Sequence, residues 1–489
     1  MIPILPTPPM LSKVSPYQGL RVLRLRPRVT SAARLACSVV RRREFPKAEH
    51  APDGGAMAQR ERTFLFMPES AFGPTNNCIG IGHRLLQRGH RVVFAADRSW
   101  QGRLAPLGFE EQLVDLAPPP AEETPQSAGQ FWKDYINAIA PQFATPTVEQ
   151  LTSVIRPIWE ELIAGAKYVE PQLRTIIGRV SPDVIVEDNV VGFPALVTAG
   201  VPYVRIVSCN PLEIPGERVA PAFSGLAQDD FAGFASFRNA YRDSHLELWS
   251  EFDAWFRAQG APGLPTLEFV GSGDMNLYVY PEELDYLDRR PLGPSWHRVE
   301  SSVRETETAV ELPVGFADGE RPVLYFSLGS LGSADVTLMR RVIDALADEP
   351  YDVIVSKGPR HDEIELAHNM WGGEFVPQTT LLARADLVIT HGGNNTVTET
   401  MHFGKPMVVL PLFWDQYDNA QRVHERGFGV RLASYDFTAE QLRGHVRALL
   451  GDESLRRRLA AASQRIRSAD GVGRAAALIE GAARATQQR

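Results

Sequence analysis

The sequence predicts an α/β fold built from two halves that face each other across a cleft. Short apolar segments of strand length alternate with amphipathic segments of helix length in both halves, as is typical of parallel sheets covered by helices. Residues 291–320 interrupt this alternation with prolines and charges, and we interpret them as an interdomain linker. The length of 489 residues also exceeds what one hydrophobic core usually serves. We therefore expect one domain over residues 57–290 and a second over residues 321–472.

The composition argues against several classes of protein. Hydrophobic residues make up 44% of the chain and charged residues 22%, and no run of about eighteen apolar residues occurs, so we expect no membrane span. The net charge is −8 and no basic stripe lies beyond the amino-terminal segment, which argues against a nucleic-acid partner. Cys37, Cys78 and Cys209 are too few and too scattered for a disulfide framework or a zinc site. We expect a cytoplasmic protein.

Residues 1–56 are a different kind of sequence. They hold ten Lys or Arg residues against three acidic residues, together with several prolines. The segment is either a disordered or non-native extension, with Met57 as the true start, or an Arg-rich organelle transit peptide. We favour the first interpretation, and in both cases we expect the fold to begin near Thr63.

The first half opens with a strand, a helix and a second strand, which is the order of a parallel βαβ unit. A second pair of strands follows, bridged by a short helix after Pro194. The expected elements are the strand Thr63–Met67, the helix Asn76–Arg88 ended by Gly89, and the strands Arg91–Ala95, Asp183–Glu187 and Val201–Val207.

Helical stretches rich in aromatic residues lie within the first half. We expect most of these side chains to pack in the core and some to line a pocket for a flat apolar molecule. They are Phe131, Trp132, Tyr135, Trp159, Phe234, Phe237, Tyr241, Trp249 and Trp255.

The second half repeats the alternation of strands and helices. Ligands of parallel α/β sheets bind at the carboxyl ends of the strands, and we expect Gly329, Ser330 and His391 to stand there. The expected elements are the strand Val323–Phe326, a turn at Ser327–Ser330, a helix over about 336–347, the strand Asp352–Val355 and a segment from Ala383 that ends as a strand at Thr390.

The most informative segment runs from Asp386 to Pro411. It reads as a buried strand, a tight turn at Gly392-Gly393, a helix that begins near Asn394, and a second apolar strand. Unpaired N–H groups and the positive end of the helix dipole make this turn an anion site, which suits a phosphate. Glu399 falls one turn after Asn395, where a carboxylate suits the hydroxyls of a diol. Phosphate plus ribose is the simplest joint ligand, and the alternative is a capped helix without a ligand.

This segment carries the pattern H-G-G-x-N-T-x-x-E, from His391 to Glu399. Phe375-Val376-Pro377-Gln378 lies upstream of it and Asp415-Gln416 downstream. The three motifs together resemble the nucleotide-sugar signature of the UDP-sugar-dependent glycosyltransferases, a family that includes the macrolide-type enzymes. The resemblance implies the GT-B fold, an α/β fold of two Rossmann-like domains facing each other across a cleft. In that fold a closing helix, here within residues 473–489, returns to the first domain.

The resemblance also implies roles in binding a nucleotide sugar. His391, Asn395 and Thr396 are implied to contact the diphosphate. Glu399 is implied to contact the ribose, and Gln378 the base or the ribose.

The remaining residues of the implied donor site contact the sugar and the base. Asp415 and Gln416 are implied to contact the hydroxyls of the donor sugar. Phe375 stands where the family commonly has Trp, and a phenyl ring stacks on a base over less area. The full implied donor-binding set is Gly329, Ser330, Phe375, Val376, Gln378, His391, Gly392, Gly393, Asn394, Asn395, Thr396, Glu399, Asp415 and Gln416.

The implied activity is transfer of a hexose from a UDP- or dTDP-sugar to a small apolar acceptor, with inversion at the anomeric carbon. The amides at Gly392–Asn395, the helix dipole and His391 stand where negative charge grows on the leaving diphosphate. No D-x-D carboxylate motif lies near them, so we expect no metal ion and no cofactor besides the nucleotide sugar. Two alternatives stay open: a nucleotide-sugar-binding protein with little or no turnover, and a nucleotide-sugar epimerase or hydrolase on the same fold.

The group that removes the acceptor proton is where the chain departs from the family. The family pattern G-H-x-x-P places Gly73 at the glycine and Pro74 at the catalytic histidine, whose customary acidic partner resembles Asp188. One explanation is that Asp188, Glu187 or Glu69 takes the proton directly. The others are an acceptor that needs little help, such as an amine or an acidic hydroxyl, and a protein without turnover. We favour the first two.

Overall fold

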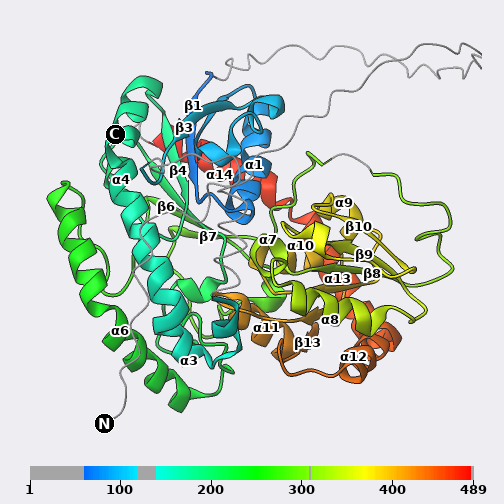
Figure 1. Cartoon of the computed structure of the whole chain (residues 1–489). Helices are drawn as coiled ribbons and strands as arrows, with labels where there is room; N and C mark the ends of the chain where they lie inside the picture. Colours follow the sequence, from blue (N-terminus) through cyan, green and yellow to red (C-terminus); the bar gives the residue numbers. More distant parts are fainter. Residues whose placement is uncertain (1–59, 119–138, 308–309, 486–489) are drawn as a thin grey trace, which may run out of the picture.

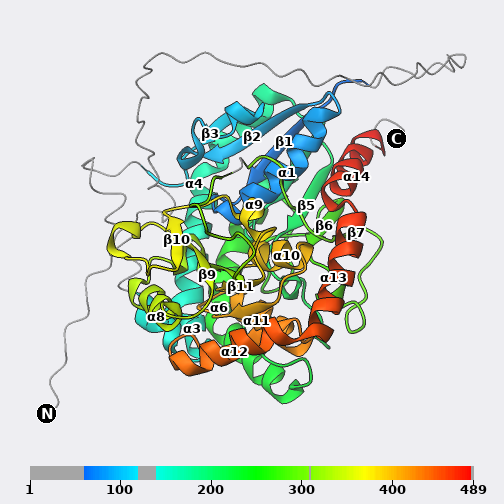
Figure 2. The same cartoon turned by 90° about the vertical axis from the view of Figure 1, so that its right-hand side faces the viewer.

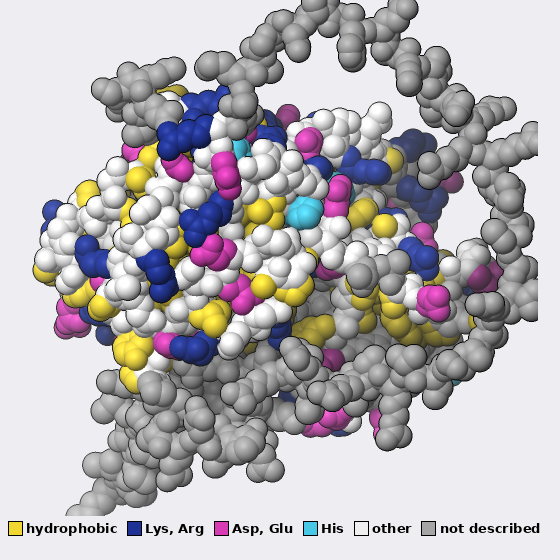
Figure 3. Space-filling view, turned by 90° about the horizontal axis from the view of Figure 1, so that it is seen from above, with side chains coloured by type: hydrophobic (Ala, Val, Ile, Leu, Met, Phe, Trp, Pro, Cys, Tyr) yellow, Lys and Arg dark blue, Asp and Glu magenta, His cyan; other side chains and the backbone are white. Residues whose placement is uncertain are grey.

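The computed structural model describes residues 60–118, 139–307 and 310–485. The amino-terminal segment 1–56 and the aromatic residues Phe131, Trp132 and Tyr135 lie outside the described residues. No helix among the described residues is long and apolar enough to cross a membrane. Basic and acidic side chains are interspersed on the face that Figure 3 shows.

The first half is built on a seven-stranded sheet in which all neighbouring strands are parallel. The central strands are buried along almost their whole length, as expected where helices cover both faces. In sheet order the strands are β3 (Glu110–Val114), β2 (Arg91–Asp97), β1 (Thr63–Pro68), β4 (Val184–Asp188), β5 (Tyr203–Val207), β6 (Met275–Val279) and β7 (Trp296–Val299).

The last strand, β7, lies inside the segment that we interpreted as linker, residues 291–320. It pairs with β6 and extends the first sheet by one edge strand. Three of its four residues are only partly buried, so the segment lacks the apolar run that marks the central strands. The first half therefore extends beyond residue 290.

Helices cover both faces of this sheet (Figure 1). The buried side chains of α1 pack on one face, and those of α4 and α6 pack on the other. A π-helical turn, Leu151–Ile155, joins α3 to α4. The helices are α1 (Phe72–Gln87), α3 (Thr147–Gln150), α4 (Arg156–Val180), α5 (Pro194–Val197) and α6 (Phe231–Ala258).

Two of the sequence predictions for these helices can be compared directly with the structure. The aromatic residues of α4 and α6 pack as expected: Trp159, Phe234 and Phe237 are buried, and Tyr241, Trp249 and Trp255 are partly buried against the core. None of these six lines the cavity between the two halves, where some of them were expected. Helix α1 begins at Phe72, earlier than the expected Asn76, because Pro74 is accommodated in its first turn.

The second half is built on a six-stranded parallel sheet with the same strand order as the first six strands of the other half. In sheet order its strands are β10 (Met370–Gly373), β9 (Asp352–Ser356), β8 (Val323–Ser327), β11 (Leu387–Thr390), β12 (Met407–Val409) and β13 (Gly429–Arg431). Its helices are α7 (Gly329–Gly332), α8 (Val336–Leu346), α9 (Gln378–Leu382), α10 (Asn394–His402), α11 (Gln416–Glu425), α12 (Ala439–Gly451) and α13 (Glu453–Ser468).

The last helix, α14 (Gly471–Ala485), leaves the second half and lies beside α1 of the first (Figures 1 and 2). Arg88 at the end of α1 donates hydrogen bonds to the Glu480 carboxylate at 3.1 Å and to the Gly473 carbonyl at 3.0 Å. The chain thus crosses between the halves twice.

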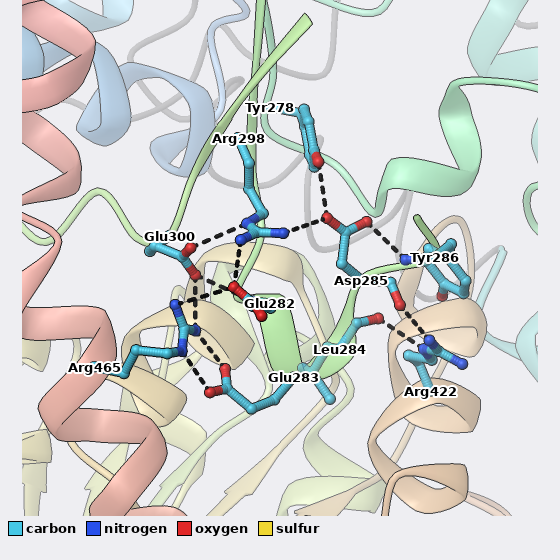
Figure 4. A network of polar contacts seen from close by, with 10 residues as sticks. All are labelled: Tyr278, Glu282, Glu283, Leu284, Asp285, Tyr286, Arg298, Glu300, Arg422 and Arg465. Carbon is cyan, nitrogen blue, oxygen red and sulfur yellow. Dashed lines mark hydrogen bonds and ion pairs between the residues drawn. The ribbon is translucent and has the colours of Figure 1, made fainter. Parts of the chain in front are cut away.

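Ion pairs join the two halves beside this crossing (Figure 4). Arg465 of α13 donates to both carboxylate oxygens of Glu283, at 2.7 and 2.6 Å, and to Glu300 at 2.9 Å. Arg422 of α11 donates to the Leu284 carbonyl at 2.7 Å and to that of Asp285. Two arginines of the second half therefore hold the turn that follows β6 in the first.

Candidate active site

The site lies where the two sheets face each other. In each sheet the strand order reverses direction beside the first strand, between β1 and β4 and between β8 and β11, and such switch points are where parallel sheets bind ligands. The loops after these four strands line one cavity of about 610 Å³. The cavity holds every residue of the implied donor set except Gly392, together with Gly73, Pro74, Glu69 and Asp188.

The turn after β11 exposes the first N–H groups of α10. Gly392 has a φ of +91°, which a residue with a side chain rarely adopts, and its N–H donates to Thr390 Oγ1 at 3.3 Å. The first helical hydrogen bond runs from the Val397 N–H to the Gly393 carbonyl at 3.1 Å. The N–H groups of the preceding turn therefore have no acceptor inside the helix, and they lie at the positive end of its dipole.

His391 is held between two glycines. A Cβ on Gly329 would lie 2.7 Å from its ring, and a Cβ on Gly393 would lie 2.6 Å from Nε2. Burial lowers the pKa of His391 to about 4, so the ring is neutral at pH 7. A neutral imidazole at this place donates one hydrogen bond to an anion without carrying charge of its own.

Asn394 and Asn395 use their side chains to reach the first half. The Asn395 amide donates to the Gly73 carbonyl at 2.9 Å and accepts from Asn77 Nδ2 at 2.8 Å. The Asn394 amide donates to the carbonyls of Ser208 at 2.9 Å and Val279 at 3.0 Å. In this structure the side chains of the two asparagines thus hold the halves together at the signature turn.

Glu399 is buried between two polar partners. Its carboxylate accepts from Arg304 Nη1 at 2.9 Å and from Gln378 Nε2 at 2.6 Å. Arg304 also pairs with Glu307, which accepts from the N–H and the hydroxyl of Thr379, each at 2.8 Å. Burial raises the pKa of Glu399, and Arg304 and Gln378 oppose that rise.

Asp415 and Gln416 stand at the start of α11. Asp415 Oδ2 accepts from the Asn210 N–H of the first half at 2.8 Å and from Asn419 Nδ2 at 3.3 Å. Burial raises the pKa of Asp415 to about 7. Gln416 Oε1 accepts from the N–H groups of Leu412 at 3.0 Å and Phe413 at 3.3 Å, so its amide nitrogen is the end left for a ligand.

Phe375 lies at the open end of the donor side. Its side chain is 44% exposed, and its ring centroid is 5.6 Å from that of Phe72 on the first half. Val376 lies beside it on the cavity wall. Two aromatic rings from opposite halves thus flank the place expected for the base.

Of the three carboxyl groups expected as candidate proton acceptors, two line the cavity and one does not. Asp188 and Glu69 both line the cavity, at the ends of the neighbouring strands β4 and β1. The Glu69 N–H donates to the Asp188 carbonyl at 2.8 Å. Glu187 does not line the cavity: its carboxylate is fully buried and accepts from the Tyr203 hydroxyl. The structure does not bring Glu187 to the cavity with Asp188 and Glu69, because adjacent residues of a strand point to opposite faces.

Asp188 is the best placed of these carboxyls. Its Oδ1 accepts from the Ser208 hydroxyl at 2.7 Å, and its Oδ2 lies 3.9 Å from the Cys78 thiol. Burial raises the pKa of Asp188 well above its ordinary value, the Ser208 hydrogen bond opposes the rise, and Glu213 and Glu69 add to it. A raised pKa makes this carboxylate a stronger base once it is ionised.

The remaining wall of the cavity is largely apolar and is built from both halves. Trp414 has a φ of +59°, and its ring packs against Phe223 with centroids 4.5 Å apart and against Trp159 at 5.1 Å. Such a backbone conformation in a bulky residue is strained and is found at functional sites. The apolar lining includes Phe72, Trp100, Ile158, Leu162, Phe413 and Trp414.

Comparisons with known proteins agree with this geometry. Residues 305–467 match the family described as UDP-glucoronosyl and UDP-glucosyl transferase. The chain is 26% identical to the NDP-glycosyltransferase YjiC of Bacillus subtilis, over 84% of this chain and 94% of the relative. It is 27% identical to the demethyllactenocin mycarosyltransferase of Streptomyces fradiae, over 88% of each chain.

Solved structures show the same fold. The glycotransferase of kitacinnamycin superposes with a TM-score of 0.61 at 22% identity, over 87% of this chain and 100% of that one. The glycosyltransferase VinC in complex with dTDP superposes with a TM-score of 0.59 at 20% identity, over 86% and 99%. The chain is a glycosyltransferase of the nucleotide-sugar-dependent, GT-B type.

The family match begins at residue 305 and so covers the donor half of the glycosyltransferase. It includes Phe375, His391, Glu399 and Asp415, all of which line the cavity. The residues that face them from the first half, Glu69 and Asp188 among them, lie outside the matched range.

Sequence reasoning missed two polar residues of the glycosyltransferase site. Arg304 lies in a segment without periodicity, and no pattern pointed to it. Asn419 follows Asp415 by four residues, and this spacing, which places both on one face of a helix, was a usable signal.

Proposed function

We propose that the enzyme transfers a hexose from a UDP- or dTDP-sugar to a small apolar acceptor, with inversion at the anomeric carbon and without a metal ion. The single cavity that joins the signature turn of the second half to Asp188 and Glu69 of the first carries this proposal. In-line attack needs the nucleophile and the leaving group on opposite sides of the anomeric carbon, and each half supplies one side. Chelation with EDTA should leave the rate unchanged.

Stabilisation of the leaving diphosphate comes from the start of α10. As the bond from the anomeric carbon to the phosphate oxygen breaks, negative charge grows on the diphosphate. The N–H groups of Gly393, Asn394 and Asn395 and the helix dipole are fixed before the reaction, so they stabilise this charge without reorganising. His391 adds one donor from a neutral ring.

Removal of the acceptor proton falls to Asp188. The acceptor hydroxyl forms its bond to the anomeric carbon as its proton passes to the Asp188 carboxylate, while the Ser208 hydroxyl fixes the orientation of that carboxylate. Glu69 lies at the same edge of the sheet and lines the same wall.

The apolar wall supports a hydrophobic acceptor. Relatives named for demethyllactenocin and zeaxanthin carry such acceptors in their names, and we extend natural-product glycosylation to this enzyme by analogy. We also propose that the enzyme is cytoplasmic and that its donor carries either UDP or dTDP.

The decisive experiment compares Asp188→Asn with Glu187→Gln. The parent should show a rate that rises with pH, because Asp188 accepts a proton only after losing its own. Asp188→Asn should lose about 10²- to 10⁴-fold in kcat for alcohol acceptors together with that rise. Glu187→Gln removes an equally buried carboxyl outside the cavity and should keep the parent's pH profile.

If Asp188→Asn transfers to alcohols as fast as the parent, the proton goes elsewhere. Pro74 at the position of the family's histidine favours one second candidate, a binding protein without turnover. That role is indicated if UDP-glucose or dTDP-glucose raises the melting temperature but no phenol, alcohol or aniline yields product. Sugar conversion without an acceptor would instead indicate an epimerase or a hydrolase.

A further inference from the structure

Asn419 occupies a fully buried position between the two halves. Its amide nitrogen donates to the Gly392 carbonyl at 2.9 Å and to Asp415 Oδ2 at 3.3 Å. Its carbonyl oxygen accepts from Asn210 Nδ2 at 2.8 Å and from the Tyr280 hydroxyl at 3.2 Å. Both donors and both acceptor sites of the amide are therefore used.

These four contacts connect three parts of the site. Gly392 belongs to the signature turn, and Asp415 lines the cavity. Asn210 and Tyr280 belong to the first half, where they follow β5 and β6. Asn419 is thus bonded to the turn, to Asp415 and to the opposite half at once.

The Asp415 carboxylate depends on the same junction. Its Oδ2 accepts one hydrogen bond from each half: the backbone N–H of Asn210 at 2.8 Å and the side chain of Asn419. Burial raises the pKa of Asp415 to about 7, and these two donors oppose the rise. One of the two donors that orient this carboxylate, the Asn210 N–H, is therefore in place only while the halves are in contact.

We propose that Asn419 is a positioning residue that makes recognition of the donor sugar depend on closure of the two halves. The inference rests on the proposed function, because it takes Asp415 as the carboxylate that meets the sugar. In the proposed function the diphosphate meets groups of the second half alone, namely the N–H groups of the signature turn and His391, whereas Asp415 is held in place from both halves. Binding of the sugar and closure onto the first half are then coupled.

The coupling has a specific signature in binding. We define the sugar increment as the affinity for UDP-glucose or dTDP-glucose divided by the affinity for the matching diphosphate. Asn419→Ala should lower the sugar increment about tenfold, because the carboxylate loses a hydrogen bond that fixes its orientation. The affinity for the diphosphate itself should change much less.

Asn369→Ala is the matched control. Asn369 is also a buried asparagine, and its amide donates to the carbonyls of Leu346, Tyr351 and Glu349 at 3.0, 3.1 and 3.2 Å, away from the cavity. Its loss destabilises the second half without touching Asp415. The control variant should keep the sugar increment of the parent even where its melting temperature falls.

Calorimetric titration of the full chain with UDP, dTDP and their glucose conjugates provides the measurement. Tyr280→Phe removes only a hydroxyl, which donates to Asn419 and accepts from Asn210 Nδ2 at 3.1 Å. It serves if Asn419→Ala does not fold, and it should lower the sugar increment in the same direction. An increment unchanged in both variants, or lowered equally by Asn369→Ala, overturns the inference. A parent that binds neither sugar nucleotide more tightly than its diphosphate also overturns it. A parent that binds no diphosphate refutes the proposed function instead.

Discussion

At the scale of single residues, the donor side shows which roles follow from spacing and which need the folded chain. The motif residues His391 and Glu399 could be placed from the sequence because they stand at a fixed distance along one strand, turn and helix, and Asp415 because it follows the next strand. The neutral state of His391 could not, since it follows from burial between residues far apart in the chain. The choice between Glu187 and Asp188 also required the sheet, because a strand end does not reveal which of two adjacent side chains faces the cleft.

Arg304 supports a prediction about donor affinity. Its guanidinium holds Glu399 through a hydrogen bond of 2.9 Å, and both side chains are almost fully buried. Without this cation the pKa of Glu399, already raised by burial, should rise further, and a protonated carboxyl accepts ribose hydroxyls less well. Arg304→Met should therefore bind UDP about tenfold more weakly at pH 6 and recover part of that affinity as the pH rises to 8.

Calorimetric titrations of UDP at pH 6, 7 and 8 test this expectation. Arg84→Met is the control, because Arg84 pairs at 3.7 Å with the exposed Glu305 and does not line the cavity. The control should follow the parent at each pH. Equal pH dependence in Arg304→Met and the parent would show that Arg304 does not set the charge of Glu399.

At the scale of elements, the strand order explains why the four loops of the cavity meet. Alternating strands and helices predicted parallel sheets in both halves, and both were found with the ligand edge at the switch points. The edge strand β7 and the true start of α1 were not predictable in the same way. The residues of β7 are mostly only partly buried, so their sequence lacks an apolar run. Gly73-Pro74 is typical of a loop, although proline also fits the first turn of a helix.

The geometry of α1 supports a prediction about position 74. Cys78 lies one helical turn after Pro74, and its thiol is 3.9 Å from the Asp188 carboxylate. An imidazole at position 74 would share that face and could pair with Asp188 as a general base. Pro74→His should therefore raise kcat for alcohol acceptors by about tenfold or more, since a positioned base typically contributes about 10²- to 10⁴-fold.

Initial rates of three variants decide whether the base explains the gain. Pro74→Ala removes the proline without adding a base and should stay near the parent rate. Pro74→His combined with Asp188→Asn should lose the gain, because the imidazole then lacks its acidic partner. A gain that appears in Pro74→Ala as well would come from the helix start and not from proton transfer.

At the scale of the whole molecule, the two halves form one closed unit rather than two independent domains. Asn394, Asn395, Arg422 and Arg465 of the second half all bond to the first, at the cavity and beside the chain crossing. The two-domain organisation could be predicted from the sequence, but these contacts could not, because they join residues about 100 to 300 positions apart whose partners no local pattern identifies. Closure thus sets both the shape of the cavity and the stability of the chain.

Glu187 should destabilise this unit progressively as the pH rises above about 5. Its carboxyl is fully buried, and burial raises its pKa to about 8 from an ordinary value near 4.5. The folded chain then holds a proton that the unfolded chain releases above pH 4.5. The contribution to stability is complete below that pH and is lost progressively as the pH rises through about 8. Asp415 and Asp418, with pKa values raised to about 7 and about 8, act in the same direction.

Glu187→Gln keeps the hydrogen-bonding shape but cannot ionise, so its melting temperature should rise relative to that of the parent between pH 5 and pH 8. The difference between the two proteins should widen steadily across this range, because it measures the proton that only the parent can lose. Glu320→Gln, which removes an exposed carboxyl, should follow the parent curve. If the melting temperatures of Glu187→Gln and the parent change with pH in parallel, Glu187 is ionised in the folded chain at neutral pH. Its carboxylate would then accept from the Tyr203 hydroxyl as a buried anion.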